Sequence, residues 1–231
     1  MTKKQFFTLS GICLLGCMLM LASLILKSHK AGVEWDGSFY NIENVNPVDA
    51  KFARPYNETL DTIGDVFVVF SGLIVVVSVF TSFFASKDKL KGFKIAFVDS
   101  LFFGISWLYG NSFYRMLKIL AGRIRPYMYF ENPSQKGIEK GDFFLSWPSG
   151  HSANVFMAFG FLLTWFTVRY ADSKLKKPVL TFSFAVCVTT MILRMLSGNH
   201  FMTDVLSGAA IGCVSGYFIS ALCYRINGEK K

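Results

Sequence analysis

Two of the three histidines in the sequence have neighbours that suit them for nucleophilic and acid–base chemistry. His200 is followed four residues later by Asp204, a spacing that stacks the two side chains on one face if they share the first turn of a helix. A carboxylate there can accept the proton of one imidazole nitrogen and leave the other lone pair free to attack. His151 directly follows the stretch "PSG", whereas the third histidine, His29, is expected to be a solvated surface residue. The pattern predicts a nucleophile at His200, an orienting acid at Asp204 and an acid–base group at His151.

Three basic residues and the start of a helix could form a site for a tetrahedral polyanion. Arg125 and Arg194 donate in planar forks, and Lys118 provides a compact point charge. Lys118 and Arg125 are seven residues apart, so on one helix they would share a face. Ser149 and Gly150, at the start of a helix, would offer free backbone N–H groups and the positive end of the helix dipole. These residues predict a phosphate-binding pocket.

An anion held by cations beside two histidines suits phosphoryl transfer through a phosphohistidine. His200 would attack phosphorus while His151 gives a proton to the departing oxygen, and His151 would then activate water to hydrolyse the intermediate. The scheme requires no metal and no other cofactor, because the cations already neutralise the equatorial oxygens. The alternative, in which the two histidines and Asp204 ligate a metal ion, is opposed by the surrounding positive charge.

Six apolar stretches must carry these residues, and they predict an all-α fold, an integral membrane six-helix bundle. The sequence is 52% hydrophobic and contains 25 Phe. A stretch of about 20 such residues crosses the hydrocarbon core as a helix, which satisfies its own backbone hydrogen bonds. The first stretch is expected to be an uncleaved helix rather than a signal peptide, since it is long and no clear cleavage site follows. Asp99, in the third stretch, is expected to be structural and within reach of Lys94 or water. The expected spans are 6–26, 66–85, 95–114, 152–168, 179–193 and 205–224.

The distribution of charge predicts which helix ends meet. With the N-terminus inside, the segments assigned to the inside are rich in lysine and arginine, whereas acidic residues outnumber basic ones in the outer loop 27–65. This positive-inside pattern predicts cytoplasmic N- and C-termini and places every candidate site residue at the outer face. The second outer loop, 115–151, breaks this rule because it has an excess of basic residues on the outer side. We expect these residues to have a local role. We expect one membrane domain, with 1–26 as the first helix, 27–65 as a structural cap and 66–231 as the catalytic five-helix portion.

The three polar clusters together resemble the type 2 phosphatidic acid phosphatase family, which shares its site with vanadium haloperoxidases. The family pattern is K-x6-RP, then PSGH, then SR-x5-H-x3-D, and the spacings of this chain match it. The resemblance, from about residue 60 to 224, implies a six-helix bundle, the phosphohistidine mechanism and metal independence. Leu193 departs from the pattern where the family usually has Ser, which removes a hydroxyl that could contact phosphate. Carried over, the resemblance assigns phosphate binding to Lys118, Arg125, Arg194, Ser149 and Gly150, nucleophilic attack to His200, acid–base transfer to His151 and the orientation of His200 to Asp204.

The expected substrate is a lipid phosphate anchored in the outer leaflet of a bacterial cytoplasmic membrane. Aromatic residues around the motifs suit a pocket at the level of the headgroups. Members of the family act on phosphatidate, phosphatidylglycerol phosphate, polyprenyl pyrophosphate or lipid A phosphate, and the sequence does not choose among them. Two alternatives stay open, a transferase that passes the phosphoryl group to another lipid and a non-enzymatic lipid-binding or transport protein. The net charge of +9 follows from the topology, so no nucleic-acid partner is expected, and the oligomeric state is left open.

Overall fold

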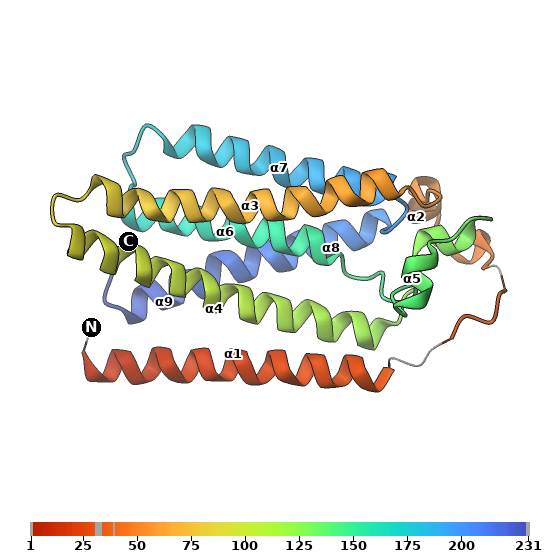
Figure 1. The fold of residues 1–231 in the computed structure, drawn as a ribbon, viewed down its shortest axis with the longest axis horizontal. Helices are drawn as coiled ribbons and strands as arrows, with labels where there is room; N and C mark the ends of the chain where they lie inside the picture. The colour runs from red at the N-terminus through yellow and green to blue at the C-terminus, as the bar shows by residue number, and fades with distance from the viewer. Residues whose placement is uncertain (1, 31–33, 39, 230–231) are drawn as a thin grey trace.

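Long helices running side by side form the molecule (Figure 1). The computed structural model describes residues 2–30, 34–38 and 40–229, and the secondary structure of these residues is helical, without strands. Six helical segments among them are long and apolar enough to cross a membrane, which confirms the predicted six-helix bundle. The helices are α1 (Lys3–Lys30), α3 (Glu58–Ala85), α4 (Lys89–Ala121), α6 (Gly150–Arg169), α7 (Lys176–Leu196) and α8 (Met202–Val214), the last continued by η3 (Ser215–Ile219) and α9 (Ser220–Ile226).

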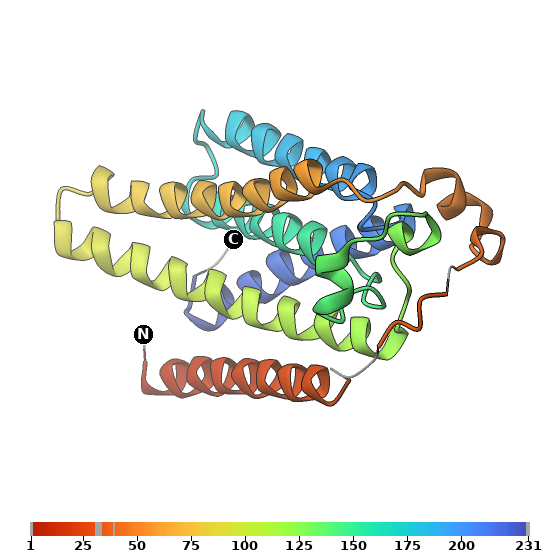
Figure 2. The same ribbon diagram turned by 45° about the vertical axis from the view of Figure 1, so that its right-hand side comes forward.

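Short elements gather at one end of the bundle. The segment between α1 and α3 contains η1 (Ile42–Asn44) and α2 (Pro47–Phe52), and the segment between α4 and α6 contains η2 (Pro126–Tyr129) and α5 (Gln135–Glu139). Figures 1 and 2 place α2 and α5 at the same end, where α3, α6 and α8 begin. Both segments are tied to the turn between α7 and α8, because Asn57 N–H donates to Ser197 O and Tyr127 N–H donates to Gly198 O. The segment before α3 therefore contacts the bundle at Asn57.

The helix α3 begins well before its apolar stretch. The side chain of Asn57 caps it by accepting the backbone N–H of Leu60. Asp61 and Asp65 consequently stand on the first turns of a membrane helix, although the sequence assigned them to the loop 27–65. The expected boundary at residue 66 is therefore wrong, because an N-cap rather than the first apolar residue fixes where this helix starts.

The helix α4 ends between the two cations of the first motif. Its last residue is Ala121, and Gly122, at φ 56°, adopts the left-handed conformation that terminates helices. Lys118 is thus helical, whereas Arg125 lies in the following segment. The expectation that these two cations share a helix face is wrong, since the glycine stops the helix before it reaches the arginine.

The helix α6 lies at the centre of the bundle. Of its apolar window 67% is buried, against 17–33% in the other five spans. It packs most closely on α8 and η3, where glycines recur every four residues and a Cβ on any of them would collide with a backbone carbonyl oxygen of the facing segment. This close approach of two backbones is the small-residue mode of packing between membrane helices. The facing pairs are Gly208 with Ser149, Gly212 with Ala153 and Gly216 with Met157.

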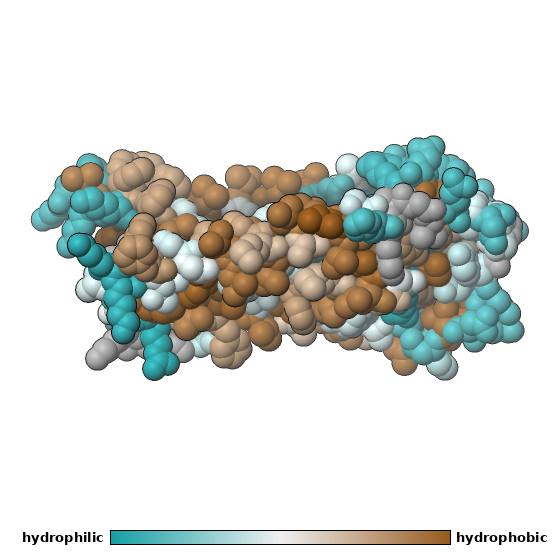
Figure 3. All heavy atoms as spheres, turned by 90° about the horizontal axis from the view of Figure 1, so that it is seen from below, coloured by the Kyte–Doolittle hydropathy of each residue, from teal (hydrophilic) through white to brown (hydrophobic). Residues whose placement is uncertain are grey.

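The surface and the chain ends agree with a membrane-spanning bundle. Figure 3 shows an apolar belt between two polar ends on the face it presents. The start of α1 and the end of α9 lie at the end opposite the short elements (Figure 1). An even number of spans brings the two termini to the same side of the membrane, in agreement with the predicted arrangement.

Asp99 has a structural role near the end that carries the termini. It is fully buried and accepts hydrogen bonds from Trp165 Nε1 at 3.0 Å and from the Tyr224 hydroxyl at 2.9 Å. Its ionic partner is Arg169, whose Nη2 lies 2.7 Å from Asp99 Oδ1 and which also pairs with Glu229. The carboxylate is thus compensated within the protein, as a buried charge must be. Lys94, the partner expected from sequence, forms no part of this network.

Candidate active site

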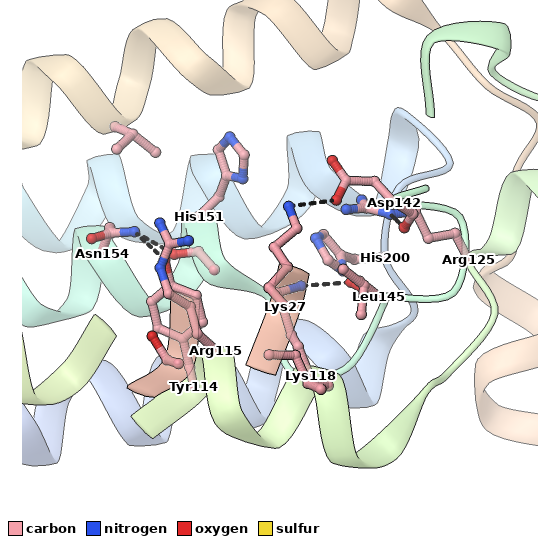
Figure 4. A pocket seen from close by; sticks show the side chains of 14 residues that line it. Lys27, Tyr114, Arg115, Lys118, Arg125, Asp142, Leu145, His151, Asn154 and His200 are labelled. Atoms are coloured by element: carbon pink, nitrogen blue, oxygen red, sulfur yellow. Dashed lines mark hydrogen bonds and ion pairs between the residues drawn. The ribbon is translucent and has the colours of Figure 1, made fainter. Parts of the chain in front are cut away.

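A cavity of about 230 Å³ brings the three motifs together. Side chains from α1, α3, α4 and α6 line it, together with residues that follow α4 and α7. Figure 4 shows basic and imidazole side chains from several elements converging on this space. Five of the predicted site residues line the cavity, namely Lys118, Arg125, Gly150, His151 and His200. The other three predicted residues, Ser149, Arg194 and Asp204, are buried and hydrogen-bonded to residues around it.

Neutral acceptors hold the two cations of the first motif. Lys118 Nζ donates to the backbone oxygen of Leu145 at 2.7 Å. Arg125 Nε donates to the backbone oxygen of Asp142 at 2.8 Å, and its Nη1 donates to Asn199 Oδ1 at 3.0 Å. Carbonyl groups fix the positions of both side chains without cancelling their charge. Among the described residues neither side chain forms an ion pair, so an anion in the cavity would be the charge partner of both.

His200 lies immediately before α8 rather than on it. The helix begins at Met202, with Phe201 as its N-cap, so the expectation that His200 and Asp204 share the first helical turn is wrong. The cause is Asp204 itself, whose Oδ2 accepts the backbone N–H of Phe201 at 2.8 Å and closes the helix start after the histidine. The two side chains still meet, because His200 Nδ1 lies 3.6 Å from Asp204 Oδ2. This distance is slightly longer than a hydrogen bond, and it leaves Nε2 as the nitrogen for attack.

Three hydrogen-bond donors hold Asp204, namely the Phe201 N–H and two side chains, and one of these connects it to the short helix α2. Ser146 Oγ donates to Asp204 Oδ2 at 2.5 Å, and Arg123 Nη1 donates to Oδ1 at 2.6 Å. The other end of the Arg123 fork binds Asp49 Oδ2 at 2.6 Å. Burial raises the pKa of Asp49, but hydrogen bonds from Arg123 and Thr203 outweigh it and leave the pKa below its usual value. Asp49 is therefore ionised and supports the orienting acid through Arg123.

His151 has a carboxylate partner of its own on α3. Its Nε2 lies 2.5 Å from Asp65 Oδ1. Figure 4 shows His151 projecting from α6 towards α3. With Nε2 donating to the carboxylate, Nδ1 is the ring nitrogen that remains for a reacting group. Asp65 thus stands to His151 as Asp204 stands to His200.

Arg194 is tied to α3 and does not line the cavity. Its side chain is 2% exposed, and Nη1 lies 2.5 Å from Asp61 Oδ1. The Tyr56 hydroxyl donates to the other carboxylate oxygen of Asp61 at 2.8 Å. Gly64 lets α3 pass closely, since a Cβ there would lie 3.1 Å from Arg194 Nη1. The Nε of Arg194 is buried and has no hydrogen-bond partner among the described residues.

The "PSGH" stretch forms the N-terminus of α6 as expected, but its serine is fully used. Ser149 Oγ accepts the Ser152 N–H at 3.4 Å as the helix cap, and the Ser149 N–H donates to Asp204 O at 2.9 Å. The N–H of Ser149 is therefore occupied, whereas the sequence predicted that it would be free to bind an anion. Gly150 lets the ring of Tyr114 approach, since a Cβ would lie 3.0 Å from it. The N–H groups of Gly150 and His151, in the first turn of α6, have no acceptor within the helix. They carry the positive end of its dipole at the cavity.

The surroundings of His200 keep its imidazole neutral. Burial lowers the pKa of His200 well below its usual value, and the neighbouring cations Lys118, Arg125 and Arg194 lower it further. A neutral imidazole has the lone pair that nucleophilic attack requires. Within the described parts of the chain, no group of three His, Cys, Asp or Glu side chains is arranged to hold a metal ion.

Sequence reasoning missed four residues around the site, Asp49, Asp61, Asp65 and Arg123. The two acids on α3 are four residues apart, so they share a helix face, and recognition of Asn57 as an N-cap could have revealed them. Arg123 stands two residues before Arg125, where it was read as part of a general basic excess. Asp49 has no such signal, because its contact with Arg123 depends on how the outer segment folds back.

Comparisons with known proteins identify the family of the chain. A sequence model described as the PAP2 superfamily matches residues 99–227, which contain all three motifs. Phosphatidylglycerophosphatase B of Bacillus subtilis (strain 168) is 32% identical over 83 residues, which are 35% of this chain and 40% of that protein. The probable lipid phosphate phosphatase beta of Arabidopsis thaliana is 26% identical over 154 residues, 58% of this chain and 68% of that protein.

A solved structure has the same fold. The crystal structure of a transmembrane PAP2 type phosphatidylglycerolphosphate phosphatase from Bacillus subtilis matches with a TM-score of 0.51 at 20% identity, over 91% of this chain and 96% of that chain. The family model covers more than half of the sequence, and the solved structure has a similar fold over most of both chains. The chain is therefore a multi-pass membrane protein that belongs to the PAP2 superfamily, the type 2 phosphatidic acid phosphatases.

Proposed function

We propose that the protein is a lipid phosphatase that removes a terminal phosphate from a membrane lipid through a phosphohistidine. One observation carries this proposal. Lys118 and Arg125, which form no ion pair among the described residues, face the same cavity as two imidazoles, each of which has a carboxylate beside it. The matched phosphatases of Bacillus subtilis and Arabidopsis thaliana support the reaction class. Fixed positive charge around a phosphate and a neutral histidine is what phosphoryl transfer to nitrogen requires.

The first step forms a phosphorus–nitrogen bond. His200 Nε2 attacks phosphorus, and the bond from phosphorus to the lipid oxygen breaks with its electron pair remaining on oxygen. Protonated His151 gives the proton of Nδ1 to that oxygen, so the lipid leaves as a neutral alcohol or a less charged phosphate. Lys118 and Arg125 hold the equatorial oxygens, and Arg194 Nε adds a donor as phosphate enters. Asp204 stabilises the positive imidazole that forms.

The second step returns the enzyme to its starting state. His151 Nδ1 takes a proton from a water molecule as the water oxygen attacks phosphorus. The phosphorus–nitrogen bond breaks, its electron pair returns to His200 Nε2, and inorganic phosphate leaves. Asp65 holds His151 in one orientation for both steps through its bond to Nε2. Asp65 is thus a positioning residue, since it acts through the histidine.

The substrate reaches the cavity from the membrane. The cavity lies near the ends of spanning helices, where a headgroup would sit while its chains stay in the bilayer. The charge distribution of the loops supports cytoplasmic termini, and the cavity would then open at the outer face of a bacterial cytoplasmic membrane. A lipid phosphate of the outer leaflet is therefore the proposed substrate.

Phosphate release from the purified, detergent-solubilised protein tests this function. The wild type should release inorganic phosphate from a short-chain phosphatidate or a polyprenyl diphosphate. His200→Ala should lower the rate by roughly 10³-fold or more, because it removes the nucleophile. His29→Ala, at the exposed end of α1, is the matched control and should keep the wild-type rate. Release by His200→Ala at the wild-type rate would refute the mechanism.

Three additions separate the alternatives. Phosphoryl transfer to an added lipid acceptor, in place of phosphate release, would identify a transferase. If the protein catalysed neither reaction, it would be a lipid-binding or transport protein. A chelator should leave the rate unchanged, whereas strong inhibition would indicate a metal site. Vanadate, which adopts the five-coordinate geometry of the transferred phosphorus, should inhibit.

A further inference from the structure

The cavity contains a guanidinium that the proposed reaction does not use. Arg115, on α4, lines the cavity together with the residues described above. Its Nε is buried and has no hydrogen-bond partner in the protein. Among the described residues, its guanidinium lies near the face of Tyr114, at 5.8 Å from guanidinium carbon to ring centroid. Such a contact is weak compared with the bond that a buried arginine normally makes to an anion.

The other charges at the cavity either pair with a carboxylate or lie where the reacting phosphate would bind. Lys27 of α1 pairs with Asp142 at 3.3 Å, and His151 pairs with Asp65. Lys118 and Arg125 lie beside His200 and suit the phosphate that reacts there. Arg115 is left without a carboxylate among the described residues that line the cavity. Keeping a partly buried cation unpaired is unfavourable, so its counter-ion is expected to come from the ligand.

The position of Arg115 indicates which part of a ligand it would meet. It precedes Lys118 by three residues on α4, so both side chains share a helix face while Arg115 lies one turn deeper in the bundle. Figure 4 shows Arg115 beyond Lys27 and His151 as seen from Arg125. A group bound at Arg115 would therefore lie between the reacting phosphate and the hydrocarbon chains of the lipid.

We propose that Arg115 binds a second phosphate of the substrate, located between the phosphate that is removed and the lipid chain. The preferred substrates are then lipids with two phosphate groups, either a diphosphate or a phosphodiester that carries a terminal phosphate monoester. Phosphatidate, with a single phosphate, leaves Arg115 without a partner. This proposal rests on the proposed phosphatase function and specifies its substrate class.

A matched pair of substrates tests the role of Arg115. Farnesyl diphosphate and farnesyl monophosphate differ only in the second phosphate, and phosphate release from both is measured on purified protein. Arg115→Gln should lower kcat/KM for the diphosphate by about 10- to 100-fold, the value of one charged hydrogen bond. The same variant should leave kcat/KM for the monophosphate nearly unchanged. Lys140→Gln, which removes an exposed charge outside the cavity, is the matched control and should affect neither substrate.

A second pair identifies the source of the second phosphate. Phosphatidylglycerol phosphate and phosphatidate with the same acyl chains differ by an internal phosphodiester. A loss by Arg115→Gln on farnesyl diphosphate alone supports a diphosphate substrate, and a loss on phosphatidylglycerol phosphate alone supports a phosphodiester. Equal losses on all four lipids would overturn the proposal, as would no loss on any of them. Arg115→Lys, which keeps the charge, should recover part of the lost activity and separates charge from folding.

The test remains informative if the proposed function fails. A farnesyl diphosphonate, in which a methylene group replaces the bridging oxygen, cannot be hydrolysed but presents both phosphorus groups. It should raise the Tm of the wild type more than that of Arg115→Gln, whether or not the protein releases phosphate. If the wild-type protein were inactive but showed this difference in Tm, the proposed phosphatase function would be contradicted while the proposed second phosphate site would be supported. Equal stabilisation of both proteins would contradict the site itself.

Discussion

His200 is a buried imidazole among cations, and this makes the stability of the protein depend on pH. Burial and the cations Lys118, Arg125 and Arg194 lower its pKa in the folded protein, whereas the unfolded chain has the usual value of about 6.5. Below that value the unfolded chain binds a proton that the folded chain does not, so stability falls as pH falls from about 6.5 towards the folded pKa. The Tm in detergent should therefore decline from pH 7 to 5, and less steeply in His200→Gln. Parallel curves for the two proteins would contradict this origin of the decline.

Asp65 pairs with His151, the proposed acid–base group, and its replacement should affect turnover more than binding. In Asp65→Asn the amide can no longer neutralise a protonated His151, but it leaves the phosphate cations Lys118 and Arg125 in place. We expect kcat to fall with little change in KM, by less than the roughly 10²- to 10⁴-fold that loss of a general acid–base group causes. Initial rates measured against substrate concentration give both constants.

Two further variants complete the test of Asp65. Asp65→Glu keeps a carboxylate and should recover part of the lost kcat. Glu58→Gln, at the exposed start of the same helix, removes an acid that contacts no site residue and should resemble the wild type. A rise in KM without a change in kcat would show that Asp65 acts on substrate binding instead.

At the scale of helices, the close contact between α6 and α8 aligns the two histidines. Gly212 faces the backbone of Ala153, and a Cβ there would overlap the carbonyl oxygen. Gly212→Ala should therefore push the helices apart and destabilise the fold by about 1–3 kcal/mol, the usual cost of overpacking. Activity should fall with it, because His151 begins one of these helices and His200 precedes the other. The Tm and the rate of phosphate release of the purified variant measure the two effects.

The helix α3 offers the matched control for this substitution. Gly72 lies in the same bundle, but no atom is within 4 Å of the position of its Cβ. Gly72→Ala should leave the Tm unchanged or raise it slightly, because alanine favours helix and meets no neighbour. Equal destabilisation by both substitutions would mean that the contact between α6 and α8 is not special.

The apolar stretches were sufficient to predict the six helices, but not where the helices end. Length and hydropathy report the part of a helix that lies in lipid, whereas caps and glycines decide its polar ends. Asn57 starts α3 early, Gly122 stops α4 early, and the carboxylate of Asp204 starts α8 late. These three ends place the acids of α3 beside the site and put His200 in a turn. Candidate residues with motif spacing could be named from the sequence, and Asp65 had a local signal in the N-cap Asn57, whereas Asp49 reaches Arg123 only through a tertiary contact.

Over the whole molecule, the site and the chain termini occupy opposite ends. The cavity lies near the end with α2 and α5, and the start of α1 and the end of α9 lie at the other (Figure 1). The basic excess of segment 115–151 now has the local reason that the topology required, since Arg115, Lys118 and Arg125 line the cavity. When these three cavity residues are left out of the count of basic residues in the outer loops, the positive-inside pattern predicts which end of the bundle faces the cytoplasm.

Labelling of single cysteines tests this orientation. In a variant whose native cysteines are replaced, Glu131→Cys introduces an exposed thiol at the cavity end, and Lys174→Cys introduces one between α6 and α7 at the other. A membrane-impermeant maleimide applied to intact cells should label Glu131→Cys and should reach Lys174→Cys only after the membrane is permeabilised. The cysteine-free parent sets the background. The reverse pattern would turn the cavity towards the cytoplasm, and since both termini would then lie outside, the substrate would have to be a lipid phosphate of the inner leaflet.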